Sequence, residues 1–290
     1  MSTPAPVTDK APARRKLALF FVLGVALTFP FYRVVASSGT LNHGMLFVLG
    51  LMWAPAAAAL LTRLVTQRNL RGTGWAWGGT RWNALAYVLP VAAAFPVYAL
   101  TWATGAGGFS PAGLAQNNAG LVGHELGSMP LDLLFAATGG VLLSSVFTLG
   151  EELGWRGLLV PELAKLTSFT GVAALSGGIW TAYHLPVMLF ADYHSNAPLP
   201  LALGGFSVVV LSAATITAWL RLKSGSVWPA TIFHASHNCF IQVVFDGLTV
   251  DTGRTQWVTT EFGAGVALAY AIVALVFWNL RNRLPTGVTP

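Results

Sequence analysis

Apolar positions along this chain form long runs, and most polar positions fall in short segments between them. Eight runs have close to the length of about 20 residues that a helix needs to cross the hydrocarbon core of a bilayer. They cover residues 17–35, 45–65, 83–102, 131–153, 170–190, 201–220, 227–245 and 263–280. The pattern predicts an all-α, polytopic membrane bundle of about eight transmembrane helices.

The segments around the runs complete this prediction. Pro90 and Pro96 lie inside the third run, where a bundled membrane helix tolerates proline because neighbouring groups satisfy the freed backbone. Residues 111–127 are too polar to span a bilayer and are expected to form an outer loop or a short surface helix. The predicted organisation is a cytoplasmic basic tail (1–16), one transmembrane domain with an intramembrane site (17–284) and a short cytoplasmic tail (285–290).

Composition and charge support this class and set an orientation. The chain is 54% hydrophobic and only 9% charged, whereas about a quarter of the residues of soluble domains are charged. Fourteen of the sixteen lysines and arginines precede the first run or follow an even-numbered one, and only Arg33 and Arg254 fall on the other side. Because basic residues stay on the cytoplasmic side, both termini are predicted to be cytoplasmic. Topology thus explains the net charge of +6 without a nucleic-acid partner.

The first run also has the layout of a secretory signal, with a basic region, an apolar region and a small-residue site near Ala36. Its length and the runs that follow favour an uncleaved first helix. The alanine-rich composition points to a bacterial cytoplasmic membrane. Cys239 is the only cysteine, so the chain forms no intramolecular disulfide.

Few ionisable or strongly polar side chains lie at membrane depth, and each is a functional hypothesis because burying it costs a few kcal/mol. Three of the apolar runs carry them, namely the fourth, the fifth and the seventh. They are Glu151, Glu152, Arg156, His184, His234, His237 and Asn238.

The spacing in the first cluster predicts different roles for its two glutamates. Glu152 and Arg156 are four residues apart, so on a helix they share a face in the better order for an ion pair. Glu151 points about 100° away and is left to face a cavity. The alternative is that all three residues end the helix at the water interface.

The other two clusters follow the same helical spacing. Ser176, Trp180 and His184 share one face, and His234 and Asn238 form a pair four residues apart. Each cluster taken singly is explained by packed, hydrogen-bonded side chains. Three such clusters in a nearly uncharged bundle are instead expected to converge on one water-holding cavity, suited to activating water and stabilising an oxyanion.

Three motifs in this order resemble the CPBP family of intramembrane proteases, which includes the CAAX prenyl endopeptidases and the Abi and bacteriocin-immunity proteins. They are Glu151-Glu152-x-x-x-Arg156, Trp180-x-x-x-His184 and His234-x-x-x-Asn238, on separate spans between residues 151 and 238. Tryptophan at position 180 stands where the family often has phenylalanine.

The resemblance implies an endopeptidase whose site lies inside the membrane and opens toward the cytosol. Glu151 and His184 would activate the attacking water, and His234 and Asn238 would stabilise the oxyanion. Glu152, Arg156 and Trp180 would support the site. The partners would be membrane lipid and a peptide or protein substrate at the membrane, either prenylated, bacteriocin-like or another bacterial membrane or secreted peptide.

The family is also described as metalloproteases, and the residue inventory permits a zinc-like site from Glu151, His184 and His234. The chain has no His-Glu-x-x-His motif; "GHELG" at 123–127 begins like one, but Ser128 follows. The interpretation favours a metal-independent glutamate mechanism, and no other cofactor is implied.

Depth along the spans sets a condition on this site. Counted at about 1.5 Å per residue, Glu151 lies near the inner edge of its run and His184 lies deeper in its own. They meet only if the fourth span is shorter or dips inward, or if the fifth begins later than residue 170 or tilts. Two rival functions stay open, a proton-coupled transporter and an inactive immunity or peptide-binding protein.

The remaining polar residues are expected to be solvated in outer loops or at span ends. They are His43, His124, His194, Asp192, Asp246, Asp251 and Glu261.

Overall fold

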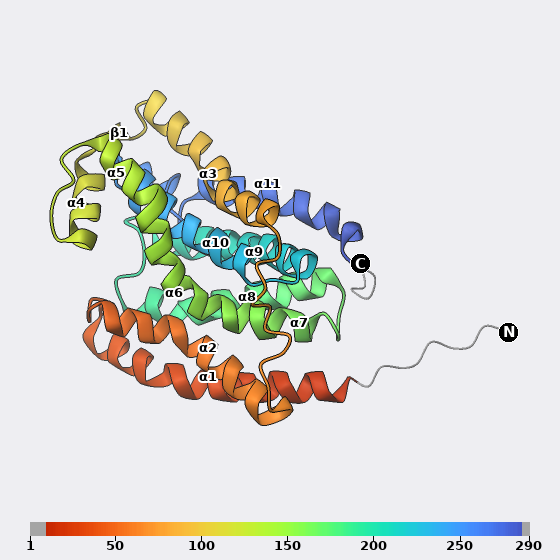
Figure 1. Ribbon diagram of the computed structural model, residues 1–290. Helices are drawn as coiled ribbons and strands as arrows, with labels where there is room; N and C mark the ends of the chain where they lie inside the picture. Colours follow the sequence, from red (N-terminus) through yellow and green to blue (C-terminus); the bar gives the residue numbers. More distant parts are fainter. Residues whose placement is uncertain (1–9, 286–290) are drawn as a thin grey trace.

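The computed structural model describes residues 10–285 and consists of long helices packed into a bundle (Figure 1). The helices of the first half are α1 (Ala11–Ser38), α2 (Met45–Gln67), α3 (Thr80–Ala103), α4 (Ala112–Val122), α5 (Met129–Phe135), α6 (Val141–Gly154) and α7 (Val160–Leu163). Those of the second half are α8 (Phe169–Phe190), α9 (Leu199–Ser224), α10 (Trp228–His237) and α11 (Ala264–Asn279). Only β1 (Gly108–Phe109) and β2 (Thr249–Val250) are strands in this range, and they pair antiparallel. The predicted all-α membrane bundle is confirmed.

Seven helices in the described residues are long and apolar enough to cross a membrane. They correspond to seven of the eight predicted runs. The eighth run, residues 227–245, forms α10 and the π-helical segment η3 (Asn238–Phe245), which continue one another inside the bundle. This helix is not among the seven, and it carries His234, His237, Asn238 and Gln242.

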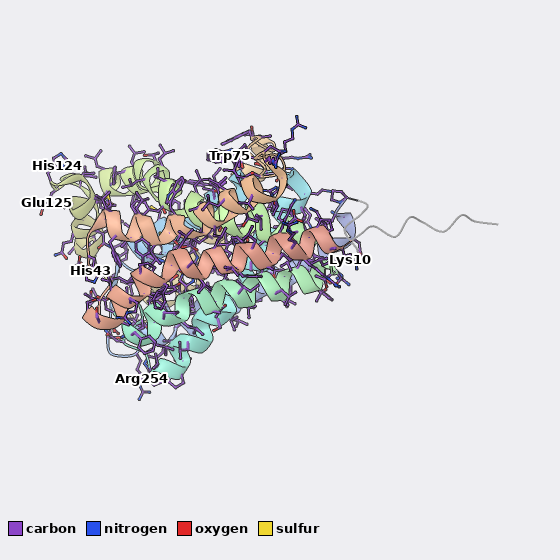
Figure 2. All side chains as sticks on the ribbon, turned by 90° about the horizontal axis from the view of Figure 1, so that it is seen from below. Lys10, His43, Trp75, His124, Glu125 and Arg254 are labelled. Atoms are coloured by element: carbon purple, nitrogen blue, oxygen red, sulfur yellow. The ribbon has the colours of Figure 1, made fainter. Side chains whose placement is uncertain are left out.

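The two ends of the bundle differ in charge. Lys10 lies at one end, and His43, His124 and Arg254 lie at the other (Figure 2). We call the first the basic end, with loops 68–79, 164–168 and 225–227, and the second the far end, with loops 39–44, 104–128, 191–198 and 246–263. The cytoplasmic placement of the basic end stays a prediction from the distribution of arginine and lysine.

Some predicted boundaries shift. Helix α1 begins at Ala11, so part of the predicted basic tail is helical. The remainder of that tail, residues 1–9, and residues 286–290 of the other tail lie outside the described residues. The polar segment 111–127 contains the short helix α4, in agreement with the surface helix considered for it.

The helix that carries Glu151 extends beyond its predicted end. Segments α5, η1 (Ala136–Gly140), α6, η2 (Trp155–Leu159) and α7 follow one another without a break, so the helix runs from Met129 to Leu163. Both η1 and η2 are π-helical and offset the register of the side chains that follow. Glu151 therefore lies well inside the bundle, not near the end of its helix. This removes the expected depth mismatch with His184, although α8 begins at Phe169 without the late start that was considered.

Two glycines let the backbones of α2 and α6 approach closely. A methyl group on Gly150 would lie 2.6 Å from the carbonyl oxygen of Met52, and one on Gly154 would lie 2.5 Å from Pro55 Cβ. Small residues at a four-residue spacing are typical of such contacts between membrane helices. Because Glu151 and Glu152 lie between these glycines, the same contact sets the depth and rotation of both carboxylates.

We expect Gly154→Ala to lower the midpoint of unfolding in detergent, because overpacking a close contact costs about 1–3 kcal/mol. Gly178→Ala is the matched control, since nothing lies within 4 Å of the added methyl group and alanine favours a helix. Thermal unfolding followed by tryptophan fluorescence measures both. Equal midpoints for the two variants would contradict the close contact of α2 with α6.

Candidate active site

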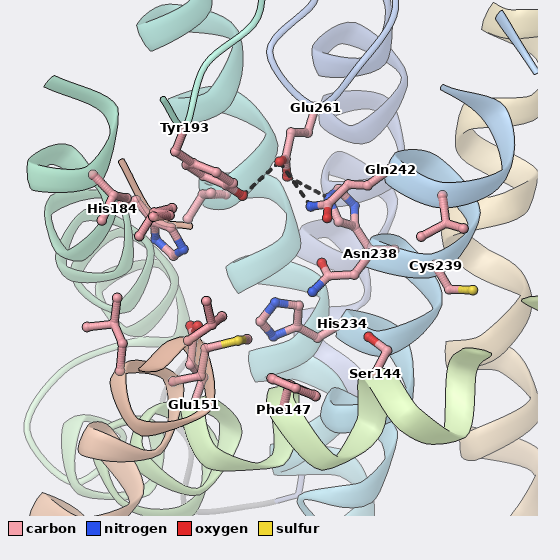
Figure 3. Close-up of a pocket in the computed structure, with 18 of the residues that line it drawn as sticks. Ser144, Phe147, Glu151, His184, Tyr193, His234, Asn238, Cys239, Gln242 and Glu261 are labelled. Atoms are coloured by element: carbon pink, nitrogen blue, oxygen red, sulfur yellow. Dashed lines mark hydrogen bonds and ion pairs between the residues drawn. The ribbon is translucent and has the colours of Figure 1, made fainter. Parts of the chain in front are cut away.

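The predicted side chains line one cavity of about 350 Å³ (Figure 3). Glu151 comes from α6, Trp180 and His184 from α8, His234 from α10 and Asn238 from η3. Glu152 and Arg156 are not among its lining residues and are fully buried beside it. The three polar clusters therefore converge as expected, with Glu151 facing the cavity.

Glu151 is held by two indole groups. Trp180 Nε1 donates a hydrogen bond to Glu151 Oε2 at 2.8 Å, and Trp155 Nε1 donates to the same oxygen at 3.2 Å. The residue is only 2% exposed. Its other oxygen, Oε1, has no hydrogen bond from the described residues and is not among the sealed, unpartnered atoms. One oxygen thus orients the carboxylate and the other is available to a ligand in the cavity.

Trp180 connects the three clusters. Its indole reaches Glu151, its ring centroid lies 5.1 Å from that of His234, and the Arg156 guanidinium carbon lies 4.3 Å above the ring. Its backbone carbonyl contacts His184 Nδ1 at 2.9 Å. Trp180, predicted to support the site, thus contacts Glu151, His184, His234 and Arg156.

The tautomer of His184 follows from this contact. A carbonyl oxygen only accepts hydrogen bonds, so Nδ1 of His184 must carry the proton. In the neutral ring, Nε2 then has the free lone pair. Since Nε2 has no partner in the described residues and His184 lines the cavity, it offers a proton acceptor there.

Glu152 bridges two positively polarised groups. Its Oε1 accepts hydrogen bonds from Arg156 Nη1 at 3.0 Å and from His234 Nδ1 at 3.1 Å. The predicted pairing of Glu152 with Arg156 is confirmed, whereas the link to His234 was not foreseen. Because His234 uses Nδ1–H for this bond, its Nε2 donates toward the cavity only when the ring is protonated.

Asn238 begins the π-helical segment η3. π-Helical turns within α-helices are frequent at functional sites. Asn238 lines the cavity, is half-buried, and its amide makes no hydrogen bond within residues 10–285. Its NH₂ group is therefore free to donate to a ligand.

A second polar cluster lies across the cavity from α6. Glu261 accepts hydrogen bonds from Tyr193 at 2.7 Å, from Gln242 at 3.0 Å and from His237 Nε2 at 3.1 Å, and His237 Nδ1 contacts the Tyr270 hydroxyl at 2.7 Å. Figure 3 shows Ser144, Phe147 and Glu151 on one side of the cavity and Tyr193, Gln242 and Glu261 on the other.

The expectation that Glu261 is solvated is wrong, because the residue is only 5% exposed. Burial favours the neutral carboxyl, but the hydrogen bonds and charge of His237, with the Tyr193 hydroxyl, hold the pKa of Glu261 below its usual value. Asp246, also expected to be solvated, accepts a 2.5 Å hydrogen bond from Tyr98. The sequence feature that could have indicated this second cluster is Gln242, which lies four residues after Asn238 and eight after His234 and so extends their helical face.

The three residues considered as metal ligands each keep one side-chain atom without a hydrogen bond from the described residues, namely Oε1 of Glu151, Nε2 of His184 and Nε2 of His234. Within residues 10–285, no group of three or more His, Cys, Asp and Glu side chains is gathered so that it could hold an ion. One oxygen of Glu151 accepts hydrogen bonds from two indole groups, and Nδ1 of His234 forms a hydrogen bond with Glu152.

The cavity extends toward the far end, and the cytosolic opening implied by the resemblance stays a prediction. Its lining includes Leu41, Met45, Leu121 and Tyr193, which lie at or near far-end loops. None of its lining residues belongs to the three described basic-end loops.

A bundle of helices long and apolar enough to span a membrane, with a carboxylate, two histidines and an amide around one cavity, is the arrangement expected of an intramembrane hydrolase. Residues 131–240 match the family of type II CAAX prenyl endopeptidase Rce1-like proteins. This match covers all three motifs and supports the predicted resemblance to the CPBP and CAAX protease family. It supports an intramembrane endopeptidase of the CAAX type in general. A search of curated proteins finds no match.

We expect Arg156→Met to destabilise the protein by about 3–5 kcal/mol, because it leaves the carboxylate of Glu152 buried without its cation. The double variant Glu152→Gln/Arg156→Met should recover part of that loss. Lys165→Met is the control, since Lys165 is 55% exposed in its pair with Glu162 and such pairs contribute about 0–1 kcal/mol. Denaturation midpoints in detergent measure all three; an Arg156→Met effect no larger than that of Lys165→Met would contradict the pairing.

Proposed function

We propose that the protein is an intramembrane endopeptidase in which Glu151 and His184 activate water, and His234 and Asn238 stabilise the oxyanion. The observation that carries this proposal is the single cavity that all four side chains line. A concave site with convergent polar groups that complement one another chemically is the expected form of an active site.

Water activation requires acceptors on the cavity side. Glu151 Oε1 and His184 Nε2 are both free of hydrogen bonds from the described residues, and each accepts one proton of a water held between them. As the water oxygen bonds to the peptide carbonyl carbon, one proton passes to this pair. The pair then returns a proton to the leaving amide nitrogen, which departs as an amine when the carbon–nitrogen bond breaks.

Oxyanion stabilisation requires donors. The NH₂ group of Asn238 is a donor at every pH, and Nε2 of His234 is a donor when the ring is protonated. Glu152 Oε1, 3.1 Å from His234 Nδ1, holds the orientation of this imidazole. Donors aimed at the developing charge in a dry site lower the barrier by about 3–4 kcal/mol each.

The walls of the cavity favour a membrane-associated peptide. Apolar side chains of α2 and α6, among them Val48, Leu51, Leu143 and Phe147, form much of the lining. They suit apolar side chains or a lipid group of a substrate, so prenylated and bacteriocin-like peptides both fit. We place the protein in a bacterial cytoplasmic membrane, with lipid as its surroundings.

We expect Glu151→Gln to reduce peptide cleavage by at least about 10²-fold, because glutamine keeps the shape but accepts no proton. His184→Gln should have an effect of similar size. Glu125→Gln, an exposed change in the far-end loop 123–128, is the control. Peptides from membranes that contain each variant or the unchanged protein are compared by mass spectrometry, which also identifies the substrate.

The rival functions give other results in the same comparison. A transporter would leave the peptide profile unchanged on Glu151→Gln and alter ion or solute flux. A protein that only binds peptides would show no cleavage before or after substitution. Either outcome overturns the proposed hydrolysis.

We expect cleavage to survive exhaustive chelation with EDTA and 1,10-phenanthroline, because Glu151 and His184 together can accept the proton of the attacking water without a metal ion. The measurement is the rate of substrate cleavage by purified protein before and after chelation. Loss of activity that one specific divalent ion restores would contradict the metal-independent mechanism.

A further inference from the structure

The lining of the cavity extends to one end of the molecule, the far end. Its deepest acidic group is Glu151, and from there its lining passes His184 and Asn238 to Leu121 of α4 and Met45 at the start of α2. The last two are 39% and 54% exposed and form an apolar rim at the far end. Ser144 and Phe147 line the cavity and precede Glu151 on α6, which places them closer to the far end than Glu151.

The basic end is closed beneath Glu151 by a plug formed by Arg63, Arg221 and loop residues 71–74. Arg63 donates hydrogen bonds to the carbonyl oxygens of Arg71 (2.8 Å), Gly72 (3.2 Å) and Gly157 (2.6 Å). Arg221 donates to the carbonyl oxygens of Arg156 (2.7 Å) and Gly72 (3.0 Å).

Three side chains of the plug are buried at the basic end. Arg63 and Arg221 are 3% and 7% exposed, and Thr73 of the loop is 2% exposed. The buried ion pair of Glu152 and Arg156 lies between the plug and the cavity and is fully sealed. Opening a path here would expose two cations whose hydrogen bonds hold three chain segments together, which would cost several charge-assisted bonds.

We propose that the active-site cavity takes its substrate from the extracytoplasmic side, so that the substrate is a peptide presented at the outer face of the membrane. The inference rests on the proposed function and on the placement of basic residues on the cytoplasmic side. The apolar rim of Met45 and Leu121 and the apolar wall of α2 and α6 receive the hydrophobic part of this peptide from the outer leaflet. The class of substrate is therefore an exported peptide or the outer end of a membrane-inserted one, in contrast to a cytosolic prenylated C-terminus.

The test labels a cysteine in the cavity from each side of the membrane. Ser144→Cys is introduced in a Cys239→Ala background, since Cys239 is the only native cysteine. The probe is a membrane-impermeant quaternary-ammonium methanethiosulfonate, applied to right-side-out and to inside-out vesicles. His124→Cys marks the far end and Leu70→Cys marks the basic end, because both residues are exposed. Mass spectrometry of the purified protein measures the fraction modified.

We expect the cysteine of Ser144→Cys to be modified from the same side as that of His124→Cys. The fraction modified should be at least about tenfold higher in right-side-out than in inside-out vesicles. The proposed route is overturned if the cysteine of Ser144→Cys is modified from the same side as that of Leu70→Cys. It is also overturned if this cysteine is modified from neither side while the denatured protein reacts fully. So does labelling of His124→Cys from the inside-out face, which would place the far end in the cytoplasm.

The labelling needs no catalytic activity, so its failure differs from failure of the proposed function. If Ser144→Cys is reached from outside but Glu151→Gln leaves the peptide profile unchanged, the route stands and the peptidase does not. If Glu151→Gln abolishes cleavage but Ser144→Cys is reached from inside, the peptidase stands and the extracytoplasmic route does not.

Discussion

The structure depends on one constraint, that a charge inside an apolar bundle must find its partners within the protein. Glu152 meets it with Arg156 and His234, and Glu261 meets it with His237, Tyr193 and Gln242. Glu151 has no cation of its own and relies on two indole donors. Oε1 of Glu151, Nε2 of His184 and the amide of Asn238 have no hydrogen bond from the described residues, and these three residues line one cavity.

The helices carry this arrangement through close packing and changes of register. Gly150 and Gly154 bring α6 against α2 and so set the rotation of the two glutamates between them. The π-helical segments η2 and η3 follow directly after α6 and α10, and η3 begins at Asn238. Trp180 then joins α6, α8 and α10 through one indole ring and one carbonyl oxygen. The positions of Glu151, His184, His234 and Asn238 are thus set by helices rather than by loops.

The two ends of the bundle differ in structure, since the basic end is closed and the far end forms the rim of the cavity. At the basic end, Arg63 and Arg221 bind backbone carbonyl oxygens and close the bundle beneath the glutamates. At the far end, the helix α4 and the start of α2 form the rim of the cavity. Arginine is suited to binding several carbonyl oxygens at once because its guanidinium group offers several donors in fixed directions.

Local sequence patterns were enough to predict the helical membrane class, most of the spans and the residues that meet in the cavity. Runs of about 20 apolar residues and four-residue spacings are local patterns, and they were sufficient for Glu151, Trp180, His184, His234 and Asn238. Only the tertiary structure decided the bond from Glu152 to His234, the burial of Glu261 and the end at which the cavity opens. These depend on how helices far apart in the chain rotate and tilt against one another, and no local spacing records that.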